Sequence, residues 1–327
     1  MRAGHEAPII VRVPPQAWDA VGGPVGDAAR LRSMNTTTLL GDKPINRMGY
    51  GAMQLAGPGV FGPPRDPEAA RAVLRRAIEL GVDHIDTSQF YGPDVVNDLI
   101  CDTLHPYPEN LKLVTKVGAR RDERGGWIPA QTPEELREGV EANLRSLRVE
   151  RVDLVNLRRL PASHGSGVPM AEQLGALEDL RHEGKLDLIG VSNVDAEGAE
   201  QAMDLVPVAQ IQNSYSIMDR EDDPILELAR ERSIAFVPFF PLGSAFTGGP
   251  AKLAQDPAIT RVAAKHGATA SQIALAWLLA HYERMLLIPG TSSVAHLEEN
   301  VAASELELDA EDLAALEAVV QVGRPHA

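Results

Sequence analysis

Eight apolar, strand-like runs alternate with amphipathic, helix-like runs over most of the chain, and this alternation constrains the fold more than any other feature. A strand followed by a helix, repeated without a break in composition, is typical of a parallel sheet whose faces are covered by helices. The predicted strands are 47–53, 82–88, 111–117, 152–158, 186–193, 209–214, 234–240 and 285–291. The predicted helices are 68–80, 133–147, 170–181, 197–205, 224–232 and 271–282.

This alternation predicts a closed (β/α)8 barrel, the TIM-barrel architecture, formed as a single domain by residues 34–327. The alternative is an open, doubly wound sheet, which normally carries a glycine-rich phosphate-binding sequence after its first strand. Gly49-Tyr-Gly-Ala-Met-Gln54, in the first predicted strand, does not supply that sequence. Thr132, with Glu135 three residues later, predicts the capped start of helix 133–147.

Composition excludes several classes of function. The formal net charge of -15 argues against nucleic acid or an anionic membrane as a partner, and no apolar run is long enough to span a bilayer. The nine histidines and the single cysteine, Cys101, show no metal-binding spacing. We therefore expect a cytoplasmic protein that needs no metal. Residues 1–33, with four prolines, are predicted to be a disordered extension or sequence upstream of a true start at Met34.

Asp86, Tyr91 and Lys116 are the strongest candidates for catalysis. Asp86 lies at the end of one predicted strand, Tyr91 follows it in a loop, and Lys116 lies inside another apolar strand. A lysine in such a strand is costly unless it is paired. An ammonium group stabilises a neighbouring phenolate, so Tyr91 is a candidate proton donor to a carbonyl oxygen that receives hydride. The alternative is a buried salt bridge beside a structural tyrosine.

Polar residues, together with one aromatic residue, collect at the ends of the predicted strands. In a (β/α)8 barrel these ends meet at one face, where the active site lies. The residues concerned are Asp86, Tyr91, Lys116, Arg158, Ser192, Asn193, Gln212, Phe239 and the segment 290–292.

A set of motifs, in this order along the chain, resembles the aldo-keto reductases. They are Asp86-Thr-Ser-x-x-Tyr91-Gly, Lys116 closing a strand, Gly190-Val-Ser-Asn193, Gln212, Pro241-Leu-Gly243, Ile288-Pro-Gly290 and Glu299-Asn300. The resemblance covers the chain from about Thr38 onward. It implies a (β/α)8 barrel that transfers hydride from a nicotinamide cofactor, usually NADPH, to an aldehyde or ketone. It also implies that Tyr91 is the proton donor and that Lys116 and Asp86 are its partners.

The same resemblance assigns three strand-end residues to the cofactor. Ser192, Asn193 and Gln212 match positions that bind the nicotinamide carboxamide, although Ser192 and Asn193 could instead begin the next helix, as Asp195 could. Phe239 occupies a position where the family often places a tyrosine that stacks on the nicotinamide. The turn formed by Leu242, Gly243 and Ser244 would offer backbone N–H groups to the pyrophosphate.

The last cofactor segment runs from Gly290 to Asn300. Thr291 and Ser292 could hydrogen-bond a 2′-phosphate near a helix start, where anions are favoured. Glu299 and Asn300 match positions that contact the adenine. The Lys or Arg that many relatives use for the phosphate is missing, and His296 stands near the usual arginine position. NADPH is the expected cofactor, with NADH as the alternative.

Arg158 departs from the family pattern, because many members carry histidine there. A permanently charged, forked arginine could favour the Tyr91 phenolate or dock an anionic substrate group such as a phenolate or phosphate. The alternative is an arginine that points to the surface. The charged segment 120–127 follows Lys116 and is interpreted as a loop that could cover the substrate, with Trp127 as its contact, or as a solvated loop.

Several strings, including 49–64, Asn156-Leu-Arg158 and 237–243, resemble the bacterial branch of the family that reduces pyridoxal to pyridoxine with NADPH. Three alternatives stay open. The substrate could be another aldehyde or ketone, the barrel could be a non-catalytic subunit that senses the cofactor, or Lys116 could form a Schiff base in an aldolase or isomerase.

Overall fold

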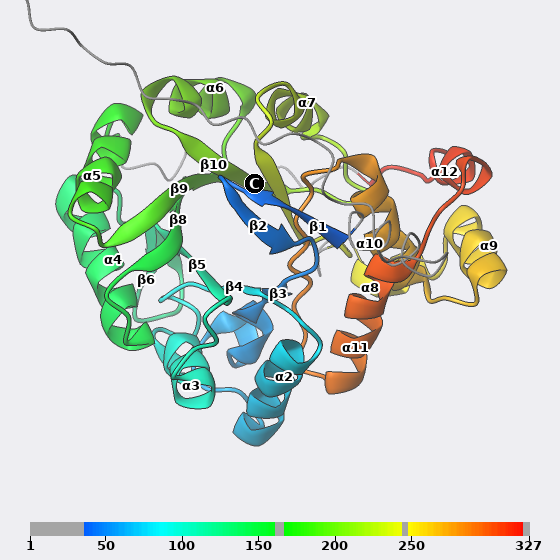
Figure 1. The fold of residues 1–327 in the computed structure, drawn as a ribbon, viewed down its shortest axis with the longest axis horizontal. Helices are drawn as coiled ribbons and strands as arrows, with labels where there is room; N and C mark the ends of the chain where they lie inside the picture. Colours follow the sequence, from blue (N-terminus) through cyan, green and yellow to red (C-terminus); the bar gives the residue numbers. More distant parts are fainter. Residues whose placement is uncertain (1–35, 161–166, 244–247, 323–327) are drawn as a thin grey trace, which may run out of the picture.

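The computed structural model describes residues 36–160, 167–243 and 248–322. Seven parallel strands form one curled sheet in the order β11-β10-β9-β8-β5-β4-β3. Helices surround this sheet on its outside (Figure 1). The strands are β3 (Tyr50–Gly51), β4 (His84–Asp86), β5 (Lys112–Val117), β8 (Val152–Arg158), β9 (Leu186–Ser192), β10 (Val208–Ser214) and β11 (Ala235–Phe239).

An extended segment at 285–288 closes the sheet into a barrel. Met285 bridges Phe236 on one side and Leu287 bridges Met48 on the other, both in parallel. The backbone N–H of Gly49 donates to the Leu287 oxygen at 2.7 Å. This segment takes the place of the predicted eighth strand, although its ladder is reduced to two bridges. The (β/α)8 prediction is therefore confirmed, and the open-sheet alternative is wrong.

The six predicted helices lie within one residue of their expected bounds, and each buries apolar residues in the core. Helix α4 also begins with the expected capping box, in which Thr132 and Glu135 bond each other's backbone N–H groups. The six helices are α2 (Pro67–Glu79), α4 (Pro133–Leu147), α5 (Met170–His182), α6 (Ala196–Leu205), α7 (Asp223–Glu231) and α10 (Ala270–His281).

Several elements were not predicted. The hairpin of β1 (Thr37–Leu40) and β2 (Lys43–Asn46) lies across the centre of the barrel in Figure 1. Its Leu40 and Ile45 are buried together with the inward-facing residues Val114, Leu154 and Leu286. The other unpredicted elements are β6 (Ala119–Arg121), β7 (Trp127–Pro129), α3 (Val95–Leu104), α8 (Gly249–Leu253), α9 (Pro257–His266), α11 (Val294–Ala302) and α12 (Ala310–Leu316).

Two predictions concern residues that the structure does not describe. The predicted disordered extension, residues 1–33, lies outside the described residues, and so does Ser244. None of the helices in the described ranges has the length and apolar character that a membrane span requires.

Candidate active site

The carboxylate of Asp86 lies at the centre of a buried polar cluster inside the barrel. Lys116, from the neighbouring strand β5, donates its ammonium to Asp86 Oδ1 and to the backbone oxygen of Thr87. Gln212, from β10 on the other side, donates its Nε2 to Asp86 Oδ2 at 2.8 Å. All three side chains are buried. The buried lysine therefore has the carboxylate partner that its place in an apolar strand required.

Tyr91 completes the cluster from the loop that follows β4. Its backbone N–H donates to the Ser88 oxygen at 3.0 Å, and its ring centroid lies 5.3 Å from Lys116 Nζ. Gly92, at φ 72°, packs so closely that a Cβ atom would lie 2.7 Å from the Gly62 oxygen. Only glycine fits this left-handed, crowded position, so it sets where the tyrosine side chain enters the barrel.

Electrostatics keep Lys116 protonated. Burial by itself would lower its pKa, but the charges of Asp86 and Tyr91 and their hydrogen bonds outweigh burial, so its pKa is raised above 10.5. A fixed ammonium beside a phenol stabilises the phenolate, and the aspartate holds that ammonium in place. The arrangement is suited to proton transfer at the Tyr91 oxygen.

Arg158 ends strand β8 and points toward this cluster, not toward the outer surface. Its guanidinium carbon lies 4.3 Å from the ring centroid of Trp127. Burial lowers the pKa of Arg158, while the nearby charges of Tyr91 and Asp86 act in the opposite direction. The alternative of a surface-pointing arginine is wrong.

The segment 120–127 is part of a β-hairpin, in which the predicted loop is reduced to the turn 122–126 between β6 and β7. In this hairpin Arg121 pairs with Trp127, and the Arg121 guanidinium carbon lies 3.6 Å from the Trp127 ring centroid. Sequence reasoning missed Arg121 as a site residue. The signal was present in Gly125-Gly126, which predicts a turn between two short strands and hence a cross-strand contact.

Ser192 lies between Arg158 and Gln212 in the sheet, because it is in register with both. Asn193 follows in a left-handed conformation at φ 58° and donates its amide to the Arg159 oxygen. Asp195 accepts from the N–H of Gly198 and caps α6, so the idea that Ser192 and Asn193 begin this helix is wrong.

Gln212 provides a direct test of whether a carboxamide could bind here. Its Nε2 is used by Asp86, but its Oε1 is buried and has no hydrogen-bond partner among the described residues. A buried acceptor without a donor is costly. The amino group of a nicotinamide carboxamide would supply that donor, so the residues present fit the cofactor.

The predicted pyrophosphate turn is only partly as expected. Phe239 ends β11 half-buried, edge-to-face with Phe240 at 5.3 Å between ring centroids. The backbone N–H of Gly243 donates to the Phe240 oxygen at 2.8 Å and thereby closes a turn. In this structure the Gly243 N–H is used within the turn, and the contact of this turn with a pyrophosphate stays a prediction. Leu242 packs against the outer core.

The segment 290–300 leads into α11. Thr291 is buried, its backbone oxygen accepts from the Tyr50 hydroxyl, and its Oγ1 accepts from the Ser293 N–H. Ser293 is the N-cap of α11 and accepts from the His296 N–H. Ser292, His296 and Glu299 are exposed, and Asn300 is buried. Gly290 is exposed, and a Cβ there would lie 2.8 Å from the Gly51 oxygen.

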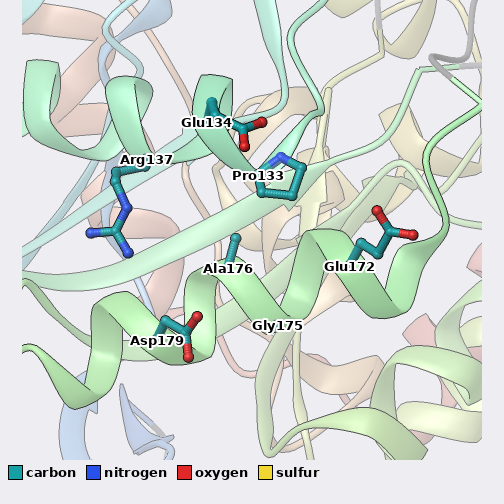
Figure 2. A pocket seen from close by; sticks show the side chains of 7 residues that line it. All are labelled: Pro133, Glu134, Arg137, Glu172, Gly175, Ala176 and Asp179. Atoms are coloured by element: carbon teal, nitrogen blue, oxygen red, sulfur yellow. The ribbon is translucent and has the colours of Figure 1, made fainter.

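Other features of the described residues lie apart from this cluster. A groove of about 370 Å³ between α4 and α5 is lined by charged side chains on the outside of the helical ring, among them Glu134, Arg137, Glu172 and Asp179 (Figure 2). None of the predicted site residues lines it. Within the described ranges, no group of three or more His, Cys, Asp or Glu side chains is arranged to hold a metal ion.

The fold and this cluster define an oxidoreductase barrel, and the comparison with known proteins agrees. Residues 47–321 match the model of the aldo/keto reductase family. The chain belongs to this family.

Among curated relatives, the pyridoxine 4-dehydrogenase of Escherichia coli is 48% identical over 289 residues, which are 88% of this chain and 99% of that protein. An uncharacterized oxidoreductase of Schizosaccharomyces pombe is 36% identical and covers 86% of this chain and 89% of its own length. Among solved structures, an aldo-keto reductase of Klebsiella pneumoniae in complex with NADPH superimposes with a TM-score of 0.73 at 25% identity, covering 86% of this chain and 94% of that chain.

Proposed function

We propose that this protein uses NADPH to reduce the aldehyde of pyridoxal to the alcohol of pyridoxine. The observation that supports the chemistry is the buried Asp86–Lys116 pair beside Tyr91. The observation that supports the substrate is the 48% identity to a pyridoxine 4-dehydrogenase, which is named for the same pair of compounds in the oxidative direction.

In this proposal Tyr91 binds the aldehyde oxygen and donates its hydroxyl proton to it. The nicotinamide cofactor, when bound, supplies the hydride. Negative charge develops on the aldehyde oxygen as the carbonyl is reduced, and a pre-placed donor stabilises it most in the transition state. Lys116 stabilises the phenolate left on Tyr91, and Asp86 holds the ammonium. General acid catalysis of this kind contributes about 10²- to 10⁴-fold.

For the cofactor, we propose that Gln212 Oε1 and the strand end at Ser192 and Asn193 hold the carboxamide, and that Phe239 covers the nicotinamide face. Ser292 and His296, at the exposed start of α11, would approach a 2′-phosphate, and Glu299 and Asn300 the adenine. The solved structures of relatives in complex with NADP or NADPH support NADPH over NADH.

The test is to follow NADPH absorbance while the purified protein is mixed with pyridoxal, with NADH in parallel. We expect consumption of NADPH with pyridoxal and a loss of about 10²-fold or more in kcat for Tyr91→Phe. Turnover of simple aldehydes but not of pyridoxal would discard the substrate and keep the reaction. Tight NADPH binding without turnover of any aldehyde would instead favour the non-catalytic alternative.

A further inference from the structure

Two guanidinium groups lie near one indole beside Tyr91. The guanidinium carbons of Arg121 and Arg158 lie 3.6 Å and 4.3 Å from the ring centroid of Trp127. Both guanidinium groups therefore contact the same indole ring. Arg121 and Trp127 come from the β6–β7 hairpin and Arg158 from the barrel strand β8.

Neither guanidinium is in direct contact with a carboxylate in the described part of the chain, although Asp86 acts on Arg158 and Asp122 on Arg121 through longer-range electrostatics. Arg121 and Arg158 form no ion pair there, and the nearest acid on the hairpin, Asp122, uses its Oδ1 to accept from the N–H groups of Arg124 and Gly126. Burial lowers the pKa of Arg121 and the charge of Arg158 lowers it further, while the charges of Tyr91 and Asp122 offset part of this effect. Two like charges held close together without a directly bonded anion are costly, and this arrangement is typical of a site that binds one.

Arg121 also has an unused hydrogen-bond donor. Its Nη1 donates to the Gly125 oxygen, and its Nη2 donates to the oxygens of Gly59 and Val60. Its Nε is buried and has no partner among the described residues. A purely structural latch between the hairpin and the segment 59–60 would explain the Nη contacts. It would explain neither the two adjacent cations that lack a direct ion pair nor the unused Nε.

The charges around Tyr91 indicate where an anion would sit. Both Arg121 and Arg158 interact electrostatically with Tyr91, and Arg158 also interacts with Asp86. A substrate whose aldehyde oxygen contacts Tyr91 would therefore bring its nearest substituent into the field of both cations. The 3-oxygen of pyridoxal is such a substituent, because it is attached ortho to the aldehyde and is readily ionised.

We propose that Arg121, together with Arg158 and Trp127, forms a subsite for a negatively charged oxygen ortho to the reacting aldehyde. The enzyme then selects aromatic aldehydes that carry an ionised ortho hydroxyl over those that lack it. This inference rests on the proposed aldehyde reduction and adds Arg121 as a residue that determines specificity.

The test compares two aldehydes that differ only in this oxygen, 3-hydroxypyridine-4-carbaldehyde and pyridine-4-carbaldehyde, with NADPH. The ratio of their kcat/KM values is measured for the wild type and for Arg121→Gln. A hydrogen bond to a charged group changes binding by about tenfold to a hundredfold, so we expect Arg121→Gln to lower this ratio by at least about tenfold, mainly through KM. Comparing ratios between proteins cancels the different intrinsic reactivity of the two aldehydes.

The matched control is Arg120→Gln, which removes the neighbouring exposed arginine that faces Glu135 at 3.7 Å. It should leave the ratio as in the wild type. A structural role of Arg121 alone would slow both aldehydes equally and leave the ratio unchanged, and that result would overturn the subsite. If Arg121→Gln does not fold, Arg121→Lys replaces it with a smaller expected drop in the ratio, because an ammonium keeps the charge but lacks the Nε donor and the planar fork. If the variant turns over both aldehydes with an unchanged ratio, the subsite is overturned but the proposed reductase activity is kept. If the wild type turns over neither aldehyde, the proposed function is overturned as well.

Discussion

The interior of the barrel and the start of α11 serve the same proposed reaction, but their charged groups differ in environment. Those in the interior are buried and paired, whereas those at the start of α11 are exposed. Asp86 is buried and receives hydrogen bonds from two different strands, through Lys116 and Gln212. At α11, His296 and Glu299 are exposed, and the segment 290–300 carries no Lys or Arg. Chemistry needs fixed, desolvated charges, because they stabilise a transition state without rearranging. Recognition of a phosphate at the surface tolerates a looser, screened site.

The largest expected effect comes from removing the buried cation. Lys116→Met would leave the Asp86 carboxylate buried without its partner and lower the free energy of unfolding by roughly 3–5 kcal/mol, because an unpaired buried charge is not compensated. Turnover should fall together with stability. Urea denaturation and the NADPH assay measure both quantities.

The matched control lies on the same strand. Lys112 faces Asp153 at 3.7 Å, and both side chains are partly exposed. Lys112→Met should change the free energy of unfolding by only about 0–1 kcal/mol, since exposed pairs contribute little. If both variants lower the free energy of unfolding equally, burial of the Lys116–Asp86 pair does not increase its effect on stability.

A second prediction concerns the unsatisfied oxygen of Gln212. Gln212→Leu removes the acceptor proposed for the cofactor carboxamide, so we expect the Kd for NADPH to rise about tenfold, as for the loss of one hydrogen bond. Quenching of tryptophan fluorescence measures this Kd. The control is Gln210→Leu, two residues earlier, whose amide donates to Asn156 and not to Asp86. A similar loss of NADPH affinity in both variants would count against a direct contact from Gln212.

A third prediction concerns the start of α11, where a substitution can add a fixed positive charge like the one in the interior. His296→Arg should raise the preference for NADPH over NADH about fivefold to tenfold, because a guanidinium forms charge-assisted hydrogen bonds with a phosphate. The gain should shrink at high salt. His182→Arg adds the same charge on the exposed side of α5 and should leave the cofactor preference unchanged. No gain from His296→Arg would indicate that the 2′-phosphate does not lie at this helix start.

The smallest effect is the pH dependence of the buried pair. The pKa of Lys116 is raised above 10.5 in the folded protein, so its contribution to stability is complete below the unfolded pKa and is lost as the pH rises through the folded one. The difference in Tm between the wild type and Lys116→Met should therefore stay constant from about pH 7 to about pH 9 and narrow only above about pH 10.5. Thermal melts across this range measure it. A difference that disappears near neutral pH would contradict the raised pKa.

The sequence by itself determined the barrel and its reactive centre. Six helices and most strands follow from local periodicity, which a chain carries in the order of its apolar residues. A lysine in a strand and an aspartate at the end of another strand are improbable in a core unless they meet, so Asp86 and Lys116 were predictable as a pair. Arg158 departs from the family pattern in the sequence, but the sequence does not determine which way its side chain points.

Only the tertiary structure decided the contacts between residues that are distant in sequence and carry no periodic signal. The hairpin β1–β2 crosses the barrel because Leu40 and Ile45 find an apolar interior there. Gln212 contacts Asp86 because β10 and β4 face each other across the barrel. Trp127 contacts both Arg121 and Arg158 because a short hairpin folds back over the strand ends. Periodicity reports which face of an element is buried, whereas the choice of partner across the barrel depends on closure of the whole sheet.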